Sequence, residues 1–402
     1  MIDSQMEDDD KSVLVQGAVD EFEHEELSSV FGSDELCAAE EEPRPFDPRK
    51  INVNALNVSM HSLLARIRND RIDMAPDFQR NAGIWTPKAK TRLIESLLIR
   101  LPLPAFYFDA TNDDRWLVID GLQRLTAIKE FVIDQKWPLQ RNHLEFLGDQ
   151  CGGKYYSDLS VGFQGNIDEA QVVACKVLQG TPPRVKFDIF RRINTGGLPL
   201  NSQEIRHALN AGPITRFLGE LAGLEAFRTA TGHMNAKRMN DRECVLRFLA
   251  FYEGNPATYK SHDFDRYLND YMEEFNRKCL SSSEEACGQY QEKLRTAFVK
   301  AMTLATDLFG DDAFRKRYEV GSKRRYQVNK ALFEAWAVNL ARVDDVSRDF
   351  LLKSKARLMK LFVQKMHDSE FAASVSQSTA NVSSVQCRFN TIRQIIDEVV
   401  YA

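Results

Sequence analysis

Strand-like sequence is confined to the first half of this 402-residue chain, and this distribution limits the folds open to it. The segments "AFYFD" and "RWLVID" are short apolar runs separated by the turn residues "ATNDD", which predicts a β-hairpin. The alternating run "AQVVACKVL" predicts another strand at about 170–178. From about residue 213 onward the apolar residues follow helical spacing, as in "VNKALFEAWAVNLARV". We therefore expect an α+β domain followed by an α-helical domain.

Capping residues mark several helix starts in the first half. Ser59 precedes a run with helical apolar spacing, so it is a candidate N-cap. Thr86 followed by Pro87 predicts a second helix start, because proline fits the first turn, where its missing N–H is not needed. Asn201 with Glu204 three residues later matches a capping box, which predicts a third helix over "NSQEIRHAL".

Charge divides the chain into an acidic tail and a basic body. Residues 1–49 carry 16 acidic and 3 basic side chains, whereas the remainder carries 42 acidic and 50 basic ones. Such a tail is typical of disordered, solvated segments, so we predict a disordered tail at 1–49, an α+β domain at 50–212 and a helical domain at 213–402. A basic body permits contact with DNA phosphates. A further hypothesis is that the tail shields a basic groove.

The cysteine pattern predicts reduced thiols in a cytoplasmic protein. The seven cysteines are odd in number, and no C-x-x-C pair occurs. No histidine or cysteine spacing typical of a metal site appears, so we assign no metal-ligating residue. No apolar run of about 18 residues occurs, so no membrane partner is expected. The N-terminus also lacks the basic-then-apolar pattern of a secretory signal.

The segment "WLVIDGLQRLTAIKEF" changes character within a few residues, from a strand to a helix. A helix N-terminus attracts anions, Gly121 would let a phosphate approach the backbone, and Arg124 offers a planar fork that matches phosphate oxygens. Asp120 could hold a metal-bound water, orient Arg124 or act as a base, and Gln123 could orient a water or a ligand. The alternative is that Asp120 simply caps the helix and Arg124 lies on its surface.

Four segments occur in an order that resembles a known family. They are "FQRNAGIW", "LIESLLIRLPLPAFYF", "VIDGLQRLTAI" and "FRRINTGGLPLNSQEIRHAL". In this order they resemble the N-terminal domain of GmrSD-type restriction proteins, within the ParB/sulfiredoxin-like superfamily, over about residues 55–210. The resemblance implies a ParB/sulfiredoxin-like nucleotide-binding domain at 50–212. It also implies nucleotide binding and hydrolysis, and a setting in prokaryotic defence against phage.

The family's Asp-Gly-Gln-Gln-Arg turn matches Asp120, Gly121, Gln123 and Arg124. The resemblance implies catalytic roles for Asp120, Gln123 and Arg124, and nucleotide binding by Gly121 and Arg124. Leu122 stands where the family has its first glutamine. A leucine side chain makes no hydrogen bond, so this departure matters for catalysis if the side chain contacts the ligand, and little if only the backbone N–H does.

Two further parts of the family pattern supply candidate nucleotide-binding residues. Gln79 and Arg80 match the family's Gln-Arg pair before the first long helix, and the resemblance implies that Arg80 is a second phosphate contact. Asn194 opens the segment that matches the family's Asn-Thr-Gly-Gly. The alternative for the latter segment is a helix C-cap followed by a turn.

The implied ligand is a nucleoside triphosphate with Mg²⁺. The implied partners are DNA, through the basic body, and a separate effector subunit. One alternative is a non-catalytic module that binds DNA or another partner and carries a vestigial pocket. A second alternative is a nuclease that uses the same pocket, although the histidines are too scattered to form an HNH cluster.

Three basic runs lie in the predicted helical domain. They are "FRKRY" at 314–318, "GSKRRY" at 321–326 and "KSKARLMK" at 353–360. Tyr318 and Tyr326 lie among them, and interleaved cations and aromatic rings can bind the backbone and bases of a nucleic acid. Solvated helix faces are the alternative explanation.

Overall fold

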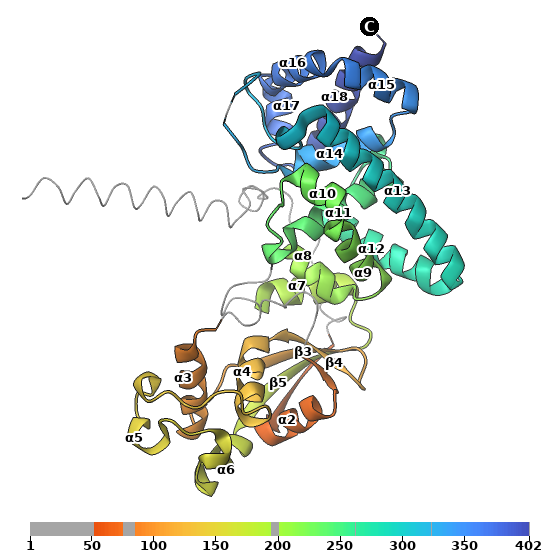
Figure 1. The fold of residues 1–402 in the computed structure, drawn as a ribbon. Helices are drawn as coiled ribbons and strands as arrows, with labels where there is room; N and C mark the ends of the chain where they lie inside the picture. Colours follow the sequence, from red (N-terminus) through yellow and green to blue (C-terminus); the bar gives the residue numbers. More distant parts are fainter. Residues whose placement is uncertain (1–51, 75–84, 194–200, 262, 323, 402) are drawn as a thin grey trace, which may run out of the picture. The chain divides into compact units, whose positions relative to one another are not determined.

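The computed structural model describes residues 52–74, 85–193, 201–261, 263–322 and 324–401 (Figure 1). Tertiary contacts divide the chain into two compact units. One unit ends at Thr215 and also includes Ala236–Asn240, and the other comprises Arg216–Asn235 and the chain from Asp241. The first contains a β-sheet and the second is helical, which confirms the predicted α+β fold class.

A five-stranded sheet forms the centre of the first unit, in the order β1-β5-β3-β4-β2. The strands are β1 (Val53–Ser59), β2 (Ile72–Asp73), β3 (Phe106–Ala110), β4 (Trp116–Asp120) and β5 (Gln171–Leu178). Strands β3 and β4 are antiparallel neighbours, which confirms the predicted hairpin, and β5 lies parallel to β3 on its other side. Strand β1 pairs antiparallel with β5, and β2 pairs parallel with β4.

Helices cover both faces of this sheet. The helices of the first unit are α2 (Met60–Arg68), α3 (Pro87–Leu98), α4 (Leu122–Val132), α5 (Gly148–Cys151), α6 (Val161–Asp168), α7 (Pro183–Ile193) and α8 (Ser202–Leu209). One core contains Phe106 and Phe108 of β3 with apolar residues of α2, α3, α4 and α6. The other contains Ile119 and Val177 with residues of α7 and α8. The two cores lie on opposite faces because successive strand residues point to opposite sides.

The predicted helix starts are confirmed by their side-chain caps. Ser59 accepts a hydrogen bond from the N–H of Ser62, and Thr86 accepts one from the N–H of Ala89 at 3.2 Å. Asn201 and Glu204 of α8 cap each other's backbone reciprocally. These polar residues therefore fix where α2, α3 and α8 begin.

A buried carboxylate organises the loop before α5. Glu95 of α3 accepts hydrogen bonds from the backbone N–H groups of Glu145, Phe146 and Leu147 at 2.7–2.9 Å. Burial raises the pKa of Glu95, but these N–H donors outweigh burial, so the net shift of the pKa is downward. The charged side chain therefore ties the loop to α3.

The second unit is built from helices. They are α9 (Pro213–Gly223), α10 (Glu225–Thr231), α11 (Asn240–Glu253), α12 (Phe264–Ser281), α13 (Glu284–Phe309), α14 (Lys330–Ala341), α15 (Asp345–Lys353), α16 (Lys355–Met366), α17 (Ser369–Ser374) and α18 (Val382–Val400). Every residue of α14 from Ala331 to Ala341 is buried, so this helix forms the centre of the unit. None of the helices in the described part of the chain is long and apolar enough to cross a membrane.

A chain of buried ion pairs crosses the core of the helical unit. Arg388 donates to the carboxylate of Glu334 at 2.8 Å, and both side chains are fully buried. Arg247 donates to the other Glu334 oxygen at 3.3 Å and to Glu243 at 2.7 Å, and Lys330 pairs with Glu243 at 2.7 Å. Removing one partner would leave a buried charge uncompensated, which makes each member structurally important.

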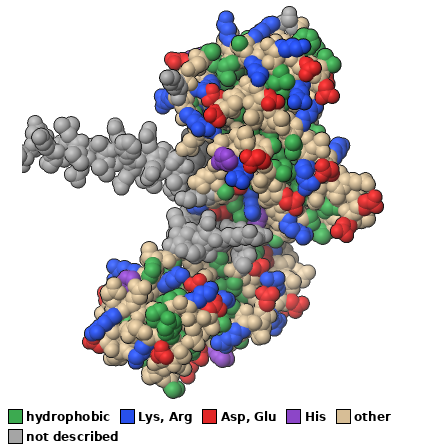
Figure 2. Space-filling view, viewed as in Figure 1, with side chains coloured by type: hydrophobic (Ala, Val, Ile, Leu, Met, Phe, Trp, Pro, Cys, Tyr) green, Lys and Arg blue, Asp and Glu red, His purple; other side chains and the backbone are tan. Residues whose placement is uncertain are grey.

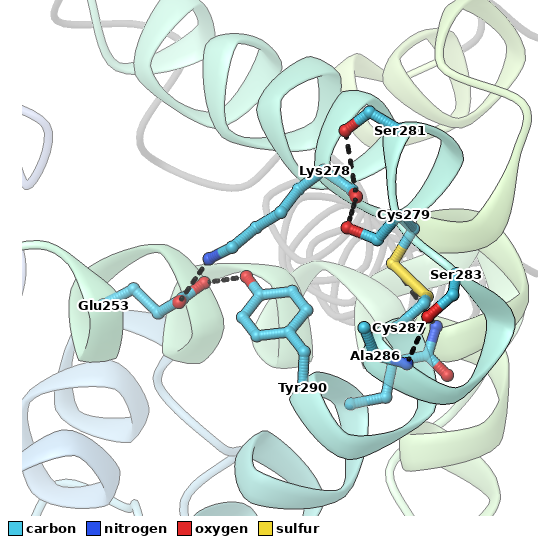
Figure 3. Close-up of a disulfide and its surroundings, with 10 residues drawn as sticks. Glu253, Lys278, Cys279, Ser281, Ser283, Ala286, Cys287 and Tyr290 are labelled. Atoms are coloured by element: carbon cyan, nitrogen blue, oxygen red, sulfur yellow. Dashed lines mark hydrogen bonds and ion pairs between the residues drawn. A yellow bond between two sulfur atoms is a disulfide. The ribbon is translucent and has the colours of Figure 1, made fainter.

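The expectation of reduced thiols is wrong at one pair of cysteines. A disulfide joins Cys279, near the end of α12, to Cys287 in the first turns of α13 (Figure 3). Their Cα atoms are 5.0 Å apart, because the short turn at 282–283 brings the two helix ends together. The sequence shows no C-x-x-C, so only the helix–turn–helix geometry reveals this pairing.

Candidate functional site

The turn between β4 and α4 depends on a glycine. Gly121 is the N-cap of α4 and has φ +95° and ψ 8°, a left-handed conformation that side chains disfavour. A Cβ atom at this position would also lie 2.4 Å from Cδ1 of Phe106, inside the core. The fold therefore requires glycine here for two independent reasons, both present without any ligand.

Asp120 and Arg124 form an ion pair across this turn. Nη2 of Arg124 donates to Oδ2 of Asp120 at 2.8 Å. The same guanidinium donates to the carbonyl oxygen of Ala105 at 3.0 Å and to that of Pro104. Asp120 therefore orients Arg124, and Arg124 ties the turn to the segment that enters β3.

The alternative in which Asp120 caps the helix is wrong. The N-cap is Gly121, and no side chain of the described residues caps α4. Arg124 is also not a surface residue, since its side chain is 12% exposed and its guanidinium carbon lies 4.6 Å from the centre of the Phe106 ring. Burial lowers the pKa of Arg124, and the charge of Asp120 acts in the opposite direction.

The start of α4 offers hydrogen-bonding groups to a ligand. Leu125 is the first residue whose N–H bonds within the helix, to the Gly121 carbonyl at 2.8 Å. The preceding amides are the donors that a helix N-terminus presents to an anion. The amide oxygen Oε1 of Gln123 is buried and has no hydrogen-bond partner within the described ranges. A ligand or a water bound at this turn would satisfy it.

Leu122, the departure from the family motif, faces the core. Its side chain is buried among the apolar residues on the α2–α4 face of the sheet. This leucine therefore contributes packing, and any contact between position 122 and a ligand would use the backbone N–H.

Two residues on neighbouring strands lie in line with Asp120. Tyr107 of β3 is the register partner of both Asp120 and Cys175. Burial raises the pKa of Tyr107, and the neighbouring Cys175, to which its hydroxyl is hydrogen-bonded, raises it further. Tyr107 is thus a neutral hydroxyl beside the carboxylate. Sequence reasoning missed it because the strand order, which sets this row, is not readable from the alternation within each strand.

Helix α8 carries a second group of buried polar side chains that sequence reasoning missed. Gln203, Arg206 and His207 are all almost fully buried, and Nε of Arg206 donates to Oε1 of Gln203 at 3.0 Å. The only sequence signal was a row of polar residues on a helix whose Ile205 is in the core. Burying such groups is costly unless they are hydrogen-bonded or paired, so a helix that buries three of them together is a candidate for a structural or binding role.

Arg238, from a distant part of the sequence, anchors the start of α8. Its guanidinium donates to Glu204 at 2.9 Å, and its carbonyl accepts from the side chain of Asn201 at 2.7 Å. Arg238 has φ +62°, a strained conformation for a residue with a side chain. Residues 236–240 thus belong to the α+β unit through specific contacts.

The remaining predicted site residues, Gln79, Arg80 and Asn194, lie outside the described residues. The structure therefore brings together Asp120, Gly121 and Arg124, with Gln123 on the same helical turn. Among the described residues, no group of three or more His, Cys, Asp or Glu side chains could hold a metal ion.

One comparison with known proteins returned a match. Residues 60–210 match the family model described as "GmrSD restriction endonuclease, N-terminal domain". A search of curated proteins and a search of solved structures returned no match. The matched region runs from α2 to just beyond α8, and so includes the β4–α4 turn. Residues 60–210 therefore form a domain of the GmrSD-type N-terminal domain family.

Proposed function

We propose that the α+β unit binds a nucleoside triphosphate with Mg²⁺ and hydrolyses it, as part of a restriction-type, anti-phage DNA transaction in the prokaryotic cytoplasm. The observation that carries this proposal is the N-terminus of α4, which has no side-chain cap among the described residues and lies beside the Asp120–Arg124 pair. The family match supports the restriction-type setting, since that is what the matched family's description names.

The proposed roles follow from the contacts of each residue. A phosphate would bind the first-turn amides of α4, beside the glycine that allows close approach. Arg124 donates three of its five guanidinium N–H groups to Asp120 and to two carbonyl oxygens. The other two N–H groups can donate to the phosphate. Asp120 keeps one carboxylate oxygen for a water or the metal, and Oε1 of Gln123 would orient the attacking water. Mg²⁺, when bound with the triphosphate, would neutralise phosphate charge.

The family resemblance adds contacts from other segments. Gln79 and Arg80 would approach the phosphates, with Arg80 as a second cation. Asn194 would contact the nucleotide through its amide. A separate effector subunit and DNA are the proposed partners of the nucleotide-bound state.

A non-catalytic module is the second candidate, and one observation favours it. Arg124 already bonds to two backbone carbonyl oxygens and to Asp120, and Leu122 faces the core. These contacts would stabilise the turn even if no nucleotide ever bound. In that case the helical unit would bind DNA or a protein partner, and the pocket would be vestigial.

The test uses Gln123→Ala, because Gln123 makes no side-chain hydrogen bond within the described ranges and its loss should leave the fold intact. Binding and hydrolysis of each ribonucleoside triphosphate are measured with Mg²⁺, with and without DNA. We expect turnover to fall while nucleotide affinity changes little, since the residue would orient water. The matched control is Gln150→Ala, at an exposed glutamine of α5.

Each outcome separates the candidates. Binding without turnover in the wild-type protein would favour a nucleotide-gated switch. No binding of any nucleotide would contradict the proposal and leave the non-catalytic module. Cleavage of DNA with Mg²⁺ or Mn²⁺ that disappears in Gln123→Ala would identify a nuclease that uses the same pocket.

A further inference from the structure

A buried arginine holds the loop between α13 and α14. Arg315 is 6% exposed and donates to three backbone carbonyl oxygens, those of Asp311 at 2.9 Å, Tyr326 at 2.9 Å and Thr231 at 2.8 Å. These contacts join the two ends of the loop to the end of α10. The cation of Arg315 is therefore committed to the loop's backbone.

A second buried arginine holds the middle of the same loop. Arg317 is 7% exposed and donates to the carbonyl oxygens of Ser322 at 2.8 Å and Arg324 at 3.0 Å, and it also pairs with Asp312. Burying a guanidinium is costly unless its N–H groups are bonded, and here the bonded carbonyl oxygens fix the loop backbone. The loop is thus a pre-organised platform, although two of its arginines are unavailable to a partner.

The platform presents cations and aromatic rings to solvent. Arg324 and Arg325 are exposed, and the Arg324 guanidinium carbon lies 4.8 Å from the centre of the Tyr326 ring. That ring meets the ring of Tyr318 edge to face at 5.8 Å. Both tyrosine side chains are partly exposed. Stacked cations and rings of this kind fit phosphates and unpaired bases.

Helix α16 extends this surface. Nε2 of His367, the C-cap of α16, donates to the carbonyl oxygen of Tyr318 at 2.8 Å. Arg357, Lys360 and Gln364 are exposed at the helical spacing that puts them on one face leading to His367. At 1.5 Å per residue this row is about 15 Å long.

The cations of this row have no acidic partner among the described residues. Four exposed cations near the junction of α15 and α16 lack an ion pair with any described carboxylate. They are Lys353, Lys355, Arg357 and Lys360. Two exposed arginines elsewhere in the unit do pair within their own helix, Arg277 with Glu274 and Arg393 with Asp397. Figure 2 shows Lys and Arg side chains along the upper edge of the helical unit, over α16 in the view of Figure 1.

We propose that this surface binds single-stranded nucleic acid. It is called here the cation–tyrosine strip, and its members are Arg324, Tyr326, Tyr318, His367, Lys360 and Arg357. The cations would contact successive phosphates, and the two tyrosines would stack on bases, which is possible only where the bases are unpaired. The inference deepens the proposed DNA-related function by naming a contact surface, and it does not depend on nucleotide hydrolysis in the other unit.

The first test measures the salt dependence of binding. The full chain is titrated into a labelled 20-nucleotide oligothymidine, and fluorescence anisotropy gives the dissociation constant at several salt concentrations. We expect Lys360→Gln to weaken binding and to reduce the slope of log affinity against log salt by about 0.7, since one phosphate contact is lost. The matched control is Lys293→Gln, at an exposed lysine of α13, which should leave both quantities unchanged.

The second test separates stacking from charge. Tyr326→Leu should weaken binding roughly tenfold with little change in the salt slope, because a stacking contact releases no counterions. Arg324→Gln tests the neighbouring cation without removing a ring. Parallel titrations with oligouridine and with a DNA duplex distinguish RNA and double-stranded DNA from single-stranded DNA.

Several outcomes would overturn the proposal. The first is that no single strand binds at low salt. The second is that Lys293→Gln and Lys360→Gln lose the same affinity. The third is that the duplex binds more tightly than the single strand and that Tyr326→Leu does not change its affinity. Nucleotide hydrolysis is measured in the same variants, and we expect it to be unchanged. If the wild-type protein binds no nucleotide, the proposed function is contradicted. The oligonucleotide titrations still test the cation–tyrosine strip independently.

Discussion

At the residue scale, the β4–α4 turn shows how much of a sequence motif the fold itself can require. Gly121 is demanded by its left-handed φ and by the ring of Phe106, and Arg124 is held by Asp120 and two carbonyl oxygens. The motif therefore has a structural explanation that is complete without a ligand. Within the described part of the chain, that explanation does not account for Oε1 of Gln123, which has no hydrogen-bond partner there, or for the uncapped amides of α4.

Gly121→Ala should destabilise the protein. The left-handed backbone alone should cost roughly 1–3 kcal/mol, and the contact with Phe106 adds to it. Urea denaturation of the purified variant measures the loss. Gly165→Ala is the control, since a Cβ there meets no atom within 4 Å and alanine should stabilise helix α6 by up to about 1 kcal/mol. Equal stability of Gly121→Ala and wild type would show that the turn relaxes freely.

The residues of the turn were predictable from the sequence, but their contacts were not. The change from strand to helix at Asp120 and Gly121 was visible in the apolar pattern. The partners of Arg124 were not, because Pro104 and Ala105 lie about twenty residues earlier and only the β3–β4 pairing brings them near. The burial of the polar side chains of α8 could not be predicted for the same reason, since burial depends on which distant segments pack over a helix.

At the element scale, local signals located several helices, among them α2, α3, α4 and α8, and the central strands of the sheet. Caps such as Ser59 and Thr86 work because they bond to the backbone three residues away, which sequence shows directly. Strand β1 was missed because it is an edge strand exposed along most of its length on both faces, and it is defined by its pairing with β5. Strand β2 has only two residues, too few for a pattern.

The Glu95 carboxylate should make the loop before α5 sensitive to acid. The folded-state pKa of Glu95 is lowered, so its contribution to stability is present above the unfolded-state pKa of about 4.3 and is lost as pH falls through the lower folded-state value. Glu95→Gln should lower the free energy of unfolding by about 2 kcal/mol at pH 7. Urea denaturation between pH 3 and pH 7 checks this.

The expected signature is a difference between wild type and Glu95→Gln that is constant near neutrality and shrinks below about pH 4.3. Glu145→Gln is a suitable control, because that side chain is largely exposed and its ion pair with Arg92 is long, at 3.7 Å. A difference that stays constant down to pH 3 would contradict the assignment of the ionised carboxylate as the acceptor.

At the scale of the whole molecule, the division into an α+β part and a helical part follows from where strand signals stop. Residues 236–240 are an exception, because they belong to the α+β unit although they lie within the helical part of the sequence, and Arg238 makes the contact. No local pattern reveals this, because the contact joins residues more than thirty positions apart. The basic runs of the helical unit were also visible in sequence, but only the structure separates arginines that hold a loop from those that face solvent.

The charge of residues 1–49 predicts an effect on nucleic-acid binding. Removing the segment takes away 16 acidic and 3 basic side chains and leaves a basic chain. We expect the shortened protein to bind oligothymidine more tightly at low salt, with the difference fading as salt screens the charges. Anisotropy titrations of both proteins measure it. Identical affinity at low salt would remove the shielding hypothesis.

The disulfide between α12 and α13 also offers a chemical readout of whether a sample has been exposed to reducing conditions. Lys278 directly precedes Cys279, and the next lysine or arginine after Cys287 is Lys293, so trypsin releases both sulfur atoms in one peptide (Figure 3). A sample that has kept the bond yields this peptide lighter by two hydrogens and closed to alkylating reagents. A single mass spectrum of the digest thus reports the redox exposure of any preparation.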